Sequence, residues 1–258
     1  MPQTKIVFFD IDGTLIDMQA KKITPKMLET LHRLQDRGIK ICIATGRSPM
    51  VLPKIDGVAF DAYLTFNGSL CYDRKGVIFS NPIPHKDVVR FIQNAAALGR
   101  PVCVSTRDRL AANGTDTDLT DYFAIANEDV PIVDNFDAMC EEDIYQLMLG
   151  CRPKDYPALL DGAPGAKIAA WWDRAVDVIP AGGGKGIGIE KMLAYYGLDK
   201  AEALAFGDGN NDREMLLAVG TGVAMENGSP ELKALADEIC GPVYEDGIYH
   251  YCADKGLI

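Results

Sequence analysis

The chain has 258 residues, a net charge of −11 and a hydrophobic fraction of 48%, the balance of a globular protein of one or two domains. The acidic surface argues against nucleic acid or an anionic membrane as a partner, and no apolar run is long enough to cross a bilayer. We expect no signal peptide, because the first residues lack a basic opening. Seven scattered cysteines without a CxxC pair indicate free thiols in a reducing cytoplasm, and argue against a disulfide framework or a zinc site.

The first third of the chain alternates between predicted strands and a predicted helix. Thr24 precedes Pro25, an N-cap followed by proline at the first helical position, and Gly38 ends the apolar periodicity of the helix at 25–36. Short apolar runs predict buried strands at 5–11, 39–45 and 62–66. This β-α-β alternation predicts a parallel sheet with crossover helices.

The pattern changes between about residues 82 and 180 and then returns. The middle stretch has predicted helices at 86–98 and 155–160, and strands of mixed polarity at 102–106, 144–150, 167–172 and 175–179. A short turn at Asp173-Arg174 predicts an antiparallel hairpin. Beyond Gly184 we expect helices at 185–196, from 211 and at 230–236, with strands at 203–206 and 222–224. The prediction is a Rossmann-like, doubly wound parallel sheet core (1–81 and 181–258) with an inserted α+β domain (82–180).

The first candidate site, Asp10-Ile11-Asp12-Gly13-Thr14, directly follows the first strand. Ligands of an open α/β sheet bind beyond the carboxyl ends of its strands. Alternation along an extended chain places Asp10 and Asp12 on one side, and Gly13 lets the chain turn away sharply. Two carboxylates held together there need a cation or a proton between them. Taken alone, the segment also fits an acidic turn that caps the next element.

Two further segments place polar groups at the same edge of the sheet. Thr45, followed by Gly46 and Arg47, ends the second strand. The segment GDGNND ends the strand at 203–206 and opens a helix, so that Asp208 and Asp212 lie four residues apart across the turn. Both carboxylates can face one hard cation, although Asp212 alone also fits an ordinary acid in the first turn of a helix.

Lys185 begins a predicted helix directly after three glycines. The segment is not a P-loop, because the GxxxxGK[ST] spacing fails and Gly186 stands where a hydroxyl residue is needed. Considered singly, this pattern predicts a solvated lysine.

Together, Asp10 with Asp12, Thr45, Lys185, and Asp208 with Asp212 resemble the motifs of the haloacid dehalogenase superfamily of phosphohydrolases, in the same order and over the whole chain. The long insertion looks like the larger α/β cap (type C2) of the Cof-like, type IIB subgroup. Thr45-Gly46-Arg47, Asn67-Gly68 and Lys185-Gly186 also match that subgroup. The three glycines before Lys185 depart from its pattern, since relatives often carry a polar residue there.

The resemblance implies a magnesium-dependent phosphatase that acts on a small phosphorylated metabolite. Asp10 would be the nucleophile that forms an aspartyl-phosphate, and Asp12 the general acid for the leaving group and then the base for water. Mg²⁺ would be held by Asp10, the backbone carbonyl of Asp12, and Asp208, with Asp212 bound directly or through water. The other implied roles are catalysis by Thr45 and Lys185, and substrate binding by Thr45, Gly46, Arg47, Asn67, Lys185 and Asn211.

Other functions remain open at this stage. A phosphomutase on the same core would return the phosphoryl group to its substrate, and a non-catalytic module would only bind Mg²⁺ or a phosphometabolite. A dehalogenase is disfavoured, because an alkyl halide has no use for Asp12 and the acidic cluster. Sugar phosphates, a flavin-mononucleotide-like cofactor and pyridoxal phosphate all fit as substrates, and the oligomeric state is not predicted.

Substrate choice is expected to lie in the inserted domain. Trp171 and Trp172 are adjacent on the strand predicted at 167–172, so one would face the domain's helices and the other the catalytic cleft. An exposed or interface aromatic fits the second tryptophan equally well. Arg107 and Arg109 lie in a loop after another strand and could meet an anionic substrate, although a solvated turn fits each of them too.

Overall fold

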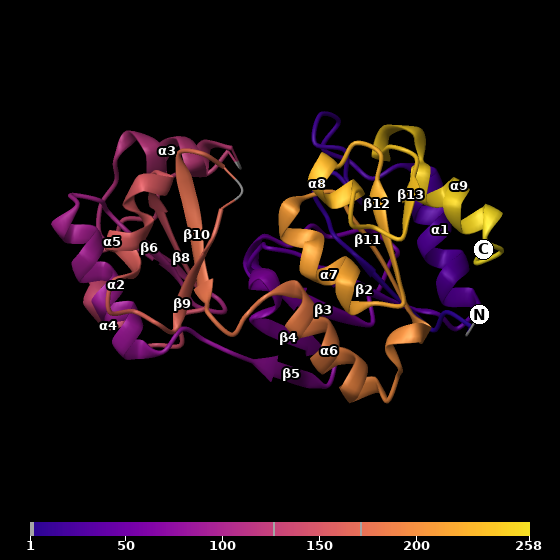
Figure 1. Ribbon diagram of the computed structural model, residues 1–258, viewed down its shortest axis with the longest axis horizontal. Coiled ribbons are helices and arrows are strands. Elements are labelled where there is room, and N and C mark those ends of the chain that lie inside the picture. Colours follow the sequence, from indigo (N-terminus) through magenta and orange to yellow (C-terminus); the bar gives the residue numbers. More distant parts are fainter. Residues whose placement is uncertain (1–2, 126, 171) are drawn as a thin grey trace. The chain divides into compact units, whose positions relative to one another are not determined.

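The computed structural model describes residues 3–125, 127–170 and 172–258, and the chain divides into two compact units (Figure 1). The first unit comprises Met1–Arg47, Pro53–Ser80 and Gly184–Ile258. The second comprises Asn81–Gly183 together with the short segment Ser48–Leu52. That segment falls inside the range 1–81 expected for the core. Both segments of the second unit therefore interrupt the chain of the first.

The first unit is built on an eight-stranded sheet with the order β13-β12-β11-β1-β2-β3-β4-β5. Neighbouring strands from β13 to β3 run parallel, and β4 and β5 add an antiparallel hairpin at one edge. The strands are β1 (Ile6–Phe9), β2 (Lys40–Ala44), β3 (Ala62–Thr65), β4 (Leu70–Asp73), β5 (Gly76–Ser80), β11 (Ala203–Gly207), β12 (Thr221–Met225) and β13 (Glu238–Cys240).

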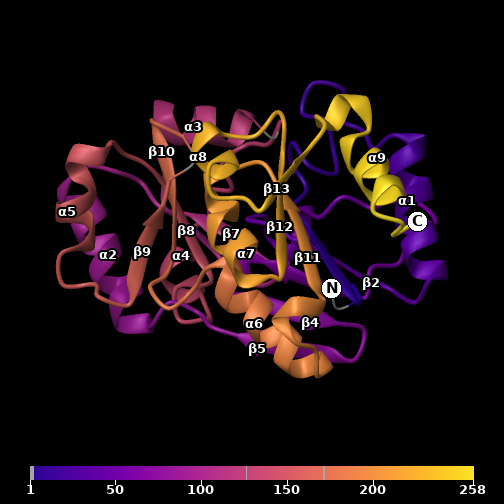
Figure 2. The ribbon, with the colours of Figure 1, turned by 45° about the vertical axis from the view of Figure 1, so that its right-hand side comes forward.

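Helices cover both faces of this sheet (Figures 1 and 2). One face carries Phe8 and packs against α6 (Lys185–Tyr196), α7 (Arg213–Ala218) and α8 (Pro230–Lys233). Phe9 lies on the opposite face, because side chains alternate along a strand. It stacks on Phe206, which contacts Tyr251 of α9 (Gly247–Asp254), and α9 in turn packs beside α1 (Pro25–Asp36). The expected doubly wound fold is confirmed.

The bounds of α1 follow from local chemistry that the sequence displays. Thr24 accepts a hydrogen bond from the Met27 amide at 3.1 Å, which satisfies an N–H that has no partner within the helix. The apolar stripe Met27, Leu31 and Leu34 is buried. Gly38, with φ of 73°, ends the helix in a left-handed conformation that glycine adopts without steric penalty.

The second unit has a five-stranded antiparallel sheet with the order β7-β6-β8-β10-β9. One face packs Val104, Leu147 and Val178 against α2, α4 and α5, and the other packs Cys103 and Met148 against α3. Helices therefore cover one face and part of the other. The elements are β6 (Cys103–Ser105), β7 (Leu110–Ala112), β8 (Gln146–Gly150), β9 (Ala166–Ala169), β10 (Ala175–Pro180), α2 (His85–Ala97), α3 (Thr117–Ala124), α4 (Phe136–Met139) and α5 (Tyr156–Leu160).

An ion-pair network ties α3 to this sheet and its loops. The Asp118 carboxylate accepts hydrogen bonds from Arg100 at 3.2 Å, from Arg152 at 3.1 and 3.2 Å, and from Arg174 at 3.2 Å. These bonds lower the pKa of Asp118, chiefly through Arg152. The bond from Arg174 to Asp118 joins residues that lie 56 positions apart in the chain.

The strand prediction for 167–172 is wrong at its C-terminal end. Strand β9 stops at Ala169, and Trp172 lies in a bend before β10, under the guanidinium of Arg174 at 4.8 Å from its ring centroid. The alternation argument therefore does not apply to Trp172. Trp171 lies outside the described residues.

All seven cysteines are free, as their scattered spacing predicts, and the structure shows that all seven are also buried. Burial raises the pKa of every one of these thiols, to about 11 for Cys140 and Cys151 and to about 12 for Cys71, Cys103, Cys240 and Cys252; that of Cys42 is also raised well above its usual value. Over the described ranges, no helix is long and apolar enough to cross a membrane.

Candidate active site

The parallel sheet of the first unit gathers the predicted site residues at one edge. Strands β11, β1, β2 and β3 are neighbours, and the carboxyl ends of parallel strands meet at the same edge. Asp10 follows β1, Thr45 follows β2, Asn67 follows β3, and Asp208 follows β11. Residues that lie far apart in sequence thus share one site.

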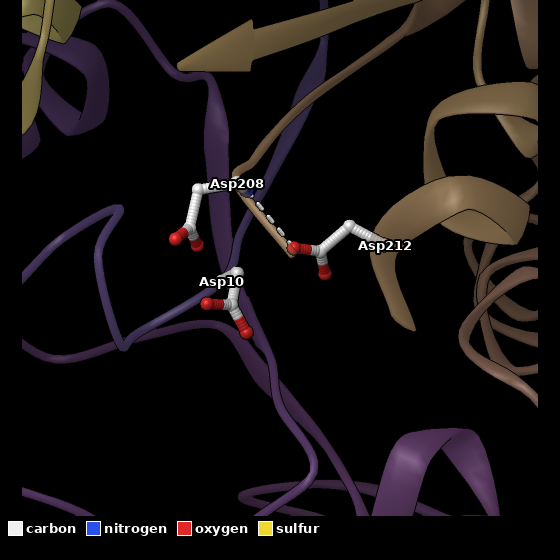
Figure 3. Close-up of side chains that lie close together, drawn as sticks. All are labelled: Asp10, Asp208 and Asp212. Carbon is white, nitrogen blue, oxygen red and sulfur yellow. Dashed lines mark hydrogen bonds between the residues drawn. The ribbon is translucent and has the colours of Figure 1, made fainter. Parts of the chain in front are cut away.

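Three carboxylates form an acidic cluster at this edge: Asp10, Asp208 and Asp212 (Figure 3). One oxygen from each lies within 4.8 Å of the others. Asp10 and Asp212 are buried and Asp208 is half-buried. Oxygen ligands with excess negative charge are what a hard divalent cation requires, so the cluster fits a metal ion.

Lys185 is the cationic partner of this cluster. Its side chain is fully buried at the first turn of α6 and donates hydrogen bonds to Asp10 Oδ1 at 2.6 Å and Asp212 Oδ1 at 2.5 Å. The interpretation of Lys185 as a solvated lysine is therefore wrong. A buried ammonium needs countercharge, and the two carboxylates provide it from 175 and 27 residues away in the chain.

The charges in the cluster are not balanced. Burial, reinforced by the neighbouring carboxylates Asp212 and Asp208, raises the pKa of Asp10 well above its ordinary value despite Lys185. Burial and the charge of Asp212 raise the pKa of Asp208 to about 7. Burial would lower the pKa of Lys185, but Asp10 and Asp212 raise it. One ammonium does not neutralise three carboxylates, which leaves a site suited to a further cation.

Asp212 is fully engaged within the protein. Its Oδ2 accepts from the backbone N–H groups of Asp208 and Gly209, each at 3.0 Å, while its Oδ1 accepts from Lys185. Asp212 thereby holds the loop that carries Asp208. This carboxylate therefore orients the backbone groups that surround it.

Gly13 and Thr14 fix the position of Asp208, a function that the sequence reasoning did not assign to them. The Thr14 hydroxyl donates to Asp208 Oδ1 at 3.1 Å. Gly13 has φ of 83°, and a Cβ there would lie 2.2 Å from Asp208 Oδ2. The segment Asp10–Thr14 therefore supplies the Asp10 and Asp12 carboxylates and also the surface against which Asp208 packs.

Asp12 is not one of the three clustered carboxylates and is paired with Arg47. The Arg47 guanidinium donates from Nε to Asp12 Oδ2 at 2.8 Å and from Nη2 to Asp12 Oδ1 at 2.6 Å, a two-pronged geometry that fixes the carboxylate plane. Both side chains are about one-third exposed. Arg47, predicted to bind substrate, is thus also the residue that orients Asp12.

The loops after β2 and β3 are hydrogen-bonded and packed against each other. Thr45 is buried, and its backbone carbonyl accepts from the Asn67 amide at 3.0 Å. Asn67 has φ of 51°, a left-handed conformation held by such contacts, and its side chain lies 3.1 Å from where a Cβ on Gly46 would stand. Asn211 donates to Asn67 Oδ1 at 3.3 Å. The structure thus groups these predicted substrate-binding residues on one polar rim.

Two arginines proposed for substrate choice lie in the second unit. Arg109 is paired with Glu142 and lies near Asp108, so its charge is already countered there. Arg107 is exposed in the turn between β6 and β7.

Comparison with known proteins shows which family the chain matches. The family model described as haloacid dehalogenase-like hydrolase matches residues 7–252. The Bacillus subtilis (strain 168) protein named "Putative phosphatase YkrA" is 35% identical over 258 residues, which cover 99% of each chain.

Two solved structures share the fold. The structure of the phosphatase BT1666 from Bacteroides thetaiotaomicron superposes with a TM-score of 0.93, at 30% identity, and covers 99% of this chain and 96% of that one. The structure described as the subclass IIB sugar phosphatase BT4131 superposes with a TM-score of 0.88, at 28% identity, over 99% and 100% of the two chains. The chain belongs to the haloacid dehalogenase-like hydrolases, as an enzyme of their Cof-like branch that hydrolyses phosphate esters.

Proposed function

We propose that the protein is a magnesium-dependent phosphatase that removes the phosphoryl group of a small phosphorylated metabolite, such as a sugar phosphate, through an aspartyl-phosphate on Asp10. The observation that supports this most is the buried Asp10 carboxylate, which is paired with Lys185 inside an acidic cluster. The sugar phosphatase with a similar structure supports the substrate class. The reduced, buried thiols support a cytoplasmic location.

The side chains suit a two-step transfer. An Asp10 oxygen attacks phosphorus while the bond to the leaving oxygen breaks, and Asp12 gives that oxygen a proton. Asp12 then takes a proton from the water that cleaves the aspartyl-phosphate, which restores both carboxyl groups. Lys185 offsets the charge on Asp10, and the Thr45 hydroxyl donates to a phosphoryl oxygen. Gly46, Arg47, Asn67 and Asn211 border the substrate.

Asp10, Asp208 and the backbone carbonyl of Asp12 would hold Mg²⁺, with Asp212 reaching it through water because both its oxygens are engaged. The cation would neutralise charge on the transferring phosphoryl group. Asp12 is bound to Arg47 in this structure, so the bond to Arg47 must loosen when Asp12 passes its proton to the leaving group.

The test is to trap the intermediate. Brief exposure to a radiolabelled sugar phosphate with Mg²⁺, followed by acid quenching, should leave label on the wild-type protein. Asp10→Asn should carry no label and show no turnover, whereas Asp36→Asn, at the exposed end of α1, should behave as wild type. Full turnover in EDTA would contradict the metal requirement, and label retained by Asp10→Asn would contradict the nucleophile.

A further inference from the structure

The turn Asn227-Gly228-Ser229, which follows β12, contacts both loops that carry the acidic cluster. Its backbone N–H at Ser229 donates to the Asp208 carbonyl at 2.9 Å. The side chain of Asn227 donates from Nδ2 to the Gly13 carbonyl at 2.8 Å. One short turn therefore binds the loop after β11 and the loop after β1.

The turn is itself anchored on its outer side. Asn227 Oδ1 accepts from the Val243 amide at 2.9 Å, so both ends of this side-chain amide are engaged. The Ser229 hydroxyl donates to Asn210 Oδ1 at 2.9 Å, a second bond to the loop after β11. On the outer side, the same hydroxyl caps α8 by accepting from the Leu232 amide at 3.2 Å. Such contacts leave the turn little freedom to follow a displaced loop.

Gly228 packs directly on the main chain of Asp208. A Cβ at this position would lie 2.9 Å from the carbonyl oxygens of both Asp208 and Met225, closer than Cβ atoms approach other atoms, and 3.0 Å from the Asp208 Cα. Relief would have to come from the backbone of Asp208 or from the turn. The separation between Asp208 and Gly13 is thus set from outside the cluster, in addition to the bond from Thr14 to Asp208 within it.

We propose that the turn Asn227–Ser229 is a positioning element that holds the Asp10–Gly13 loop and Asp208 at the spacing required to bind Mg²⁺. This inference rests on the proposed magnesium dependence. Contacts from the turn to the ligand-bearing loops would affect metal binding, because a small octahedral cation tolerates little displacement of its ligands. Loss of outer partners usually weakens metal binding or activity by about 10- to 100-fold.

The experiment compares Gly228→Ala with Gly220→Ala as a matched control. Gly220 precedes β12 at its other end, and a Cβ there would meet the Ala201 Cα at 2.7 Å and the Lys200 carbonyl at 2.8 Å, a comparable backbone clash far along the strand from the cluster. Mg²⁺ binding is measured by titration calorimetry, and the melting temperature (Tm) of each variant is measured in EDTA.

Both variants should lower Tm, but only Gly228→Ala should raise the Kd for Mg²⁺, by about 10-fold or more. Asn227→Ala, which removes one neutral hydrogen bond to Gly13, should raise it by about 2- to 10-fold and decides the matter if Gly228→Ala does not fold. Wild-type Kd values in Asn227→Ala, or in a folded Gly228→Ala, would overturn the inference. A wild-type protein that binds no Mg²⁺ would overturn the proposed metal dependence, and this inference with it.

Discussion

Replacing Lys185 with methionine tests the electrostatics of the acidic cluster without relying on catalysis. Methionine keeps an unbranched, apolar side chain in a fully buried position but removes the ammonium that is bonded to both Asp10 and Asp212. Removing one partner of a buried ion pair costs about 3–5 kcal/mol, because the remaining charge stays desolvated. We therefore expect Lys185→Met to lower the free energy of unfolding by about that amount near pH 8 in EDTA.

The loss of unfolding free energy caused by Lys185→Met should become smaller as the pH falls. Without Lys185, the carboxyls of Asp10 and Asp208, whose pKa values are already raised, bind protons more tightly in the folded protein than in the unfolded chain. Stability then increases with acidification, by at most about 1.4 kcal/mol per pH unit for each extra proton that the folded variant binds. Between about pH 8 and about pH 5.5, the difference from wild type should narrow by at least about 1 kcal/mol.

Urea unfolding at the two pH values measures both effects. Lys5→Met is the matched control, because Lys5 pairs with Glu202 while half exposed, and such surface pairs contribute only about 0–1 kcal/mol. Added Mg²⁺ should restore part of the stability of Lys185→Met near pH 8. The reasoning would be refuted if Lys185→Met lost no more unfolding free energy than Lys5→Met, or if its loss did not change with pH.

Three further outcomes are expected. Asp12→Asn should slow hydrolysis of an alkyl phosphate by about 10²–10⁴-fold but that of an activated aryl phosphate much less, since a good leaving group needs little protonation; equal losses in steady-state kcat would contradict its role as acid. Mg²⁺ should bind about 10-fold more weakly near pH 6 than near pH 8 in a calorimetric titration, because the proton held by Asp208, with its pKa of about 7, must leave first; a flat profile would contradict this. Asp118→Asn should destabilise the second unit by about 1–3 kcal/mol near pH 7, seen as earlier urea unfolding; the difference should begin to shrink only below about pH 4 and should disappear once the pH falls below the lowered pKa of the wild-type carboxyl.

The parallel core could be predicted because its strands are buried on both sides and read as continuous apolar runs, and because capping residues mark α1. The β4–β5 hairpin was missed, although it carries a readable turn: Asp73 Oδ1 accepts from the Lys75 and Gly76 amides. The end of β9 could not be inferred locally, because aromatic residues are typical of strands wherever tertiary packing permits them.

In the site, too, some features could be predicted from local sequence and others depend on tertiary contacts. Motifs at strand ends place Asp10, Thr45 and Asp208 together, since topology brings those ends to one edge. The burial of Lys185 and the pairing of Asp12 with Arg47 depend on contacts across 175 and 35 residues, which no local pattern displays. The contacts of Asn227 and Gly228 are equally long-range, and only the folded chain reveals them.

The burial of every cysteine gives the protein a set of built-in reporters. Alkylating reagents attack thiolates that solvent can reach, so native thiols with raised pKa values react only after the surrounding structure opens. Cys42, Cys71, Cys240 and Cys252 belong to the first unit, whereas Cys103, Cys140 and Cys151 belong to the second. Pulsed alkylation in increasing urea, read cysteine by cysteine in a mass spectrometer, would therefore follow the opening of each unit separately, with no engineered label.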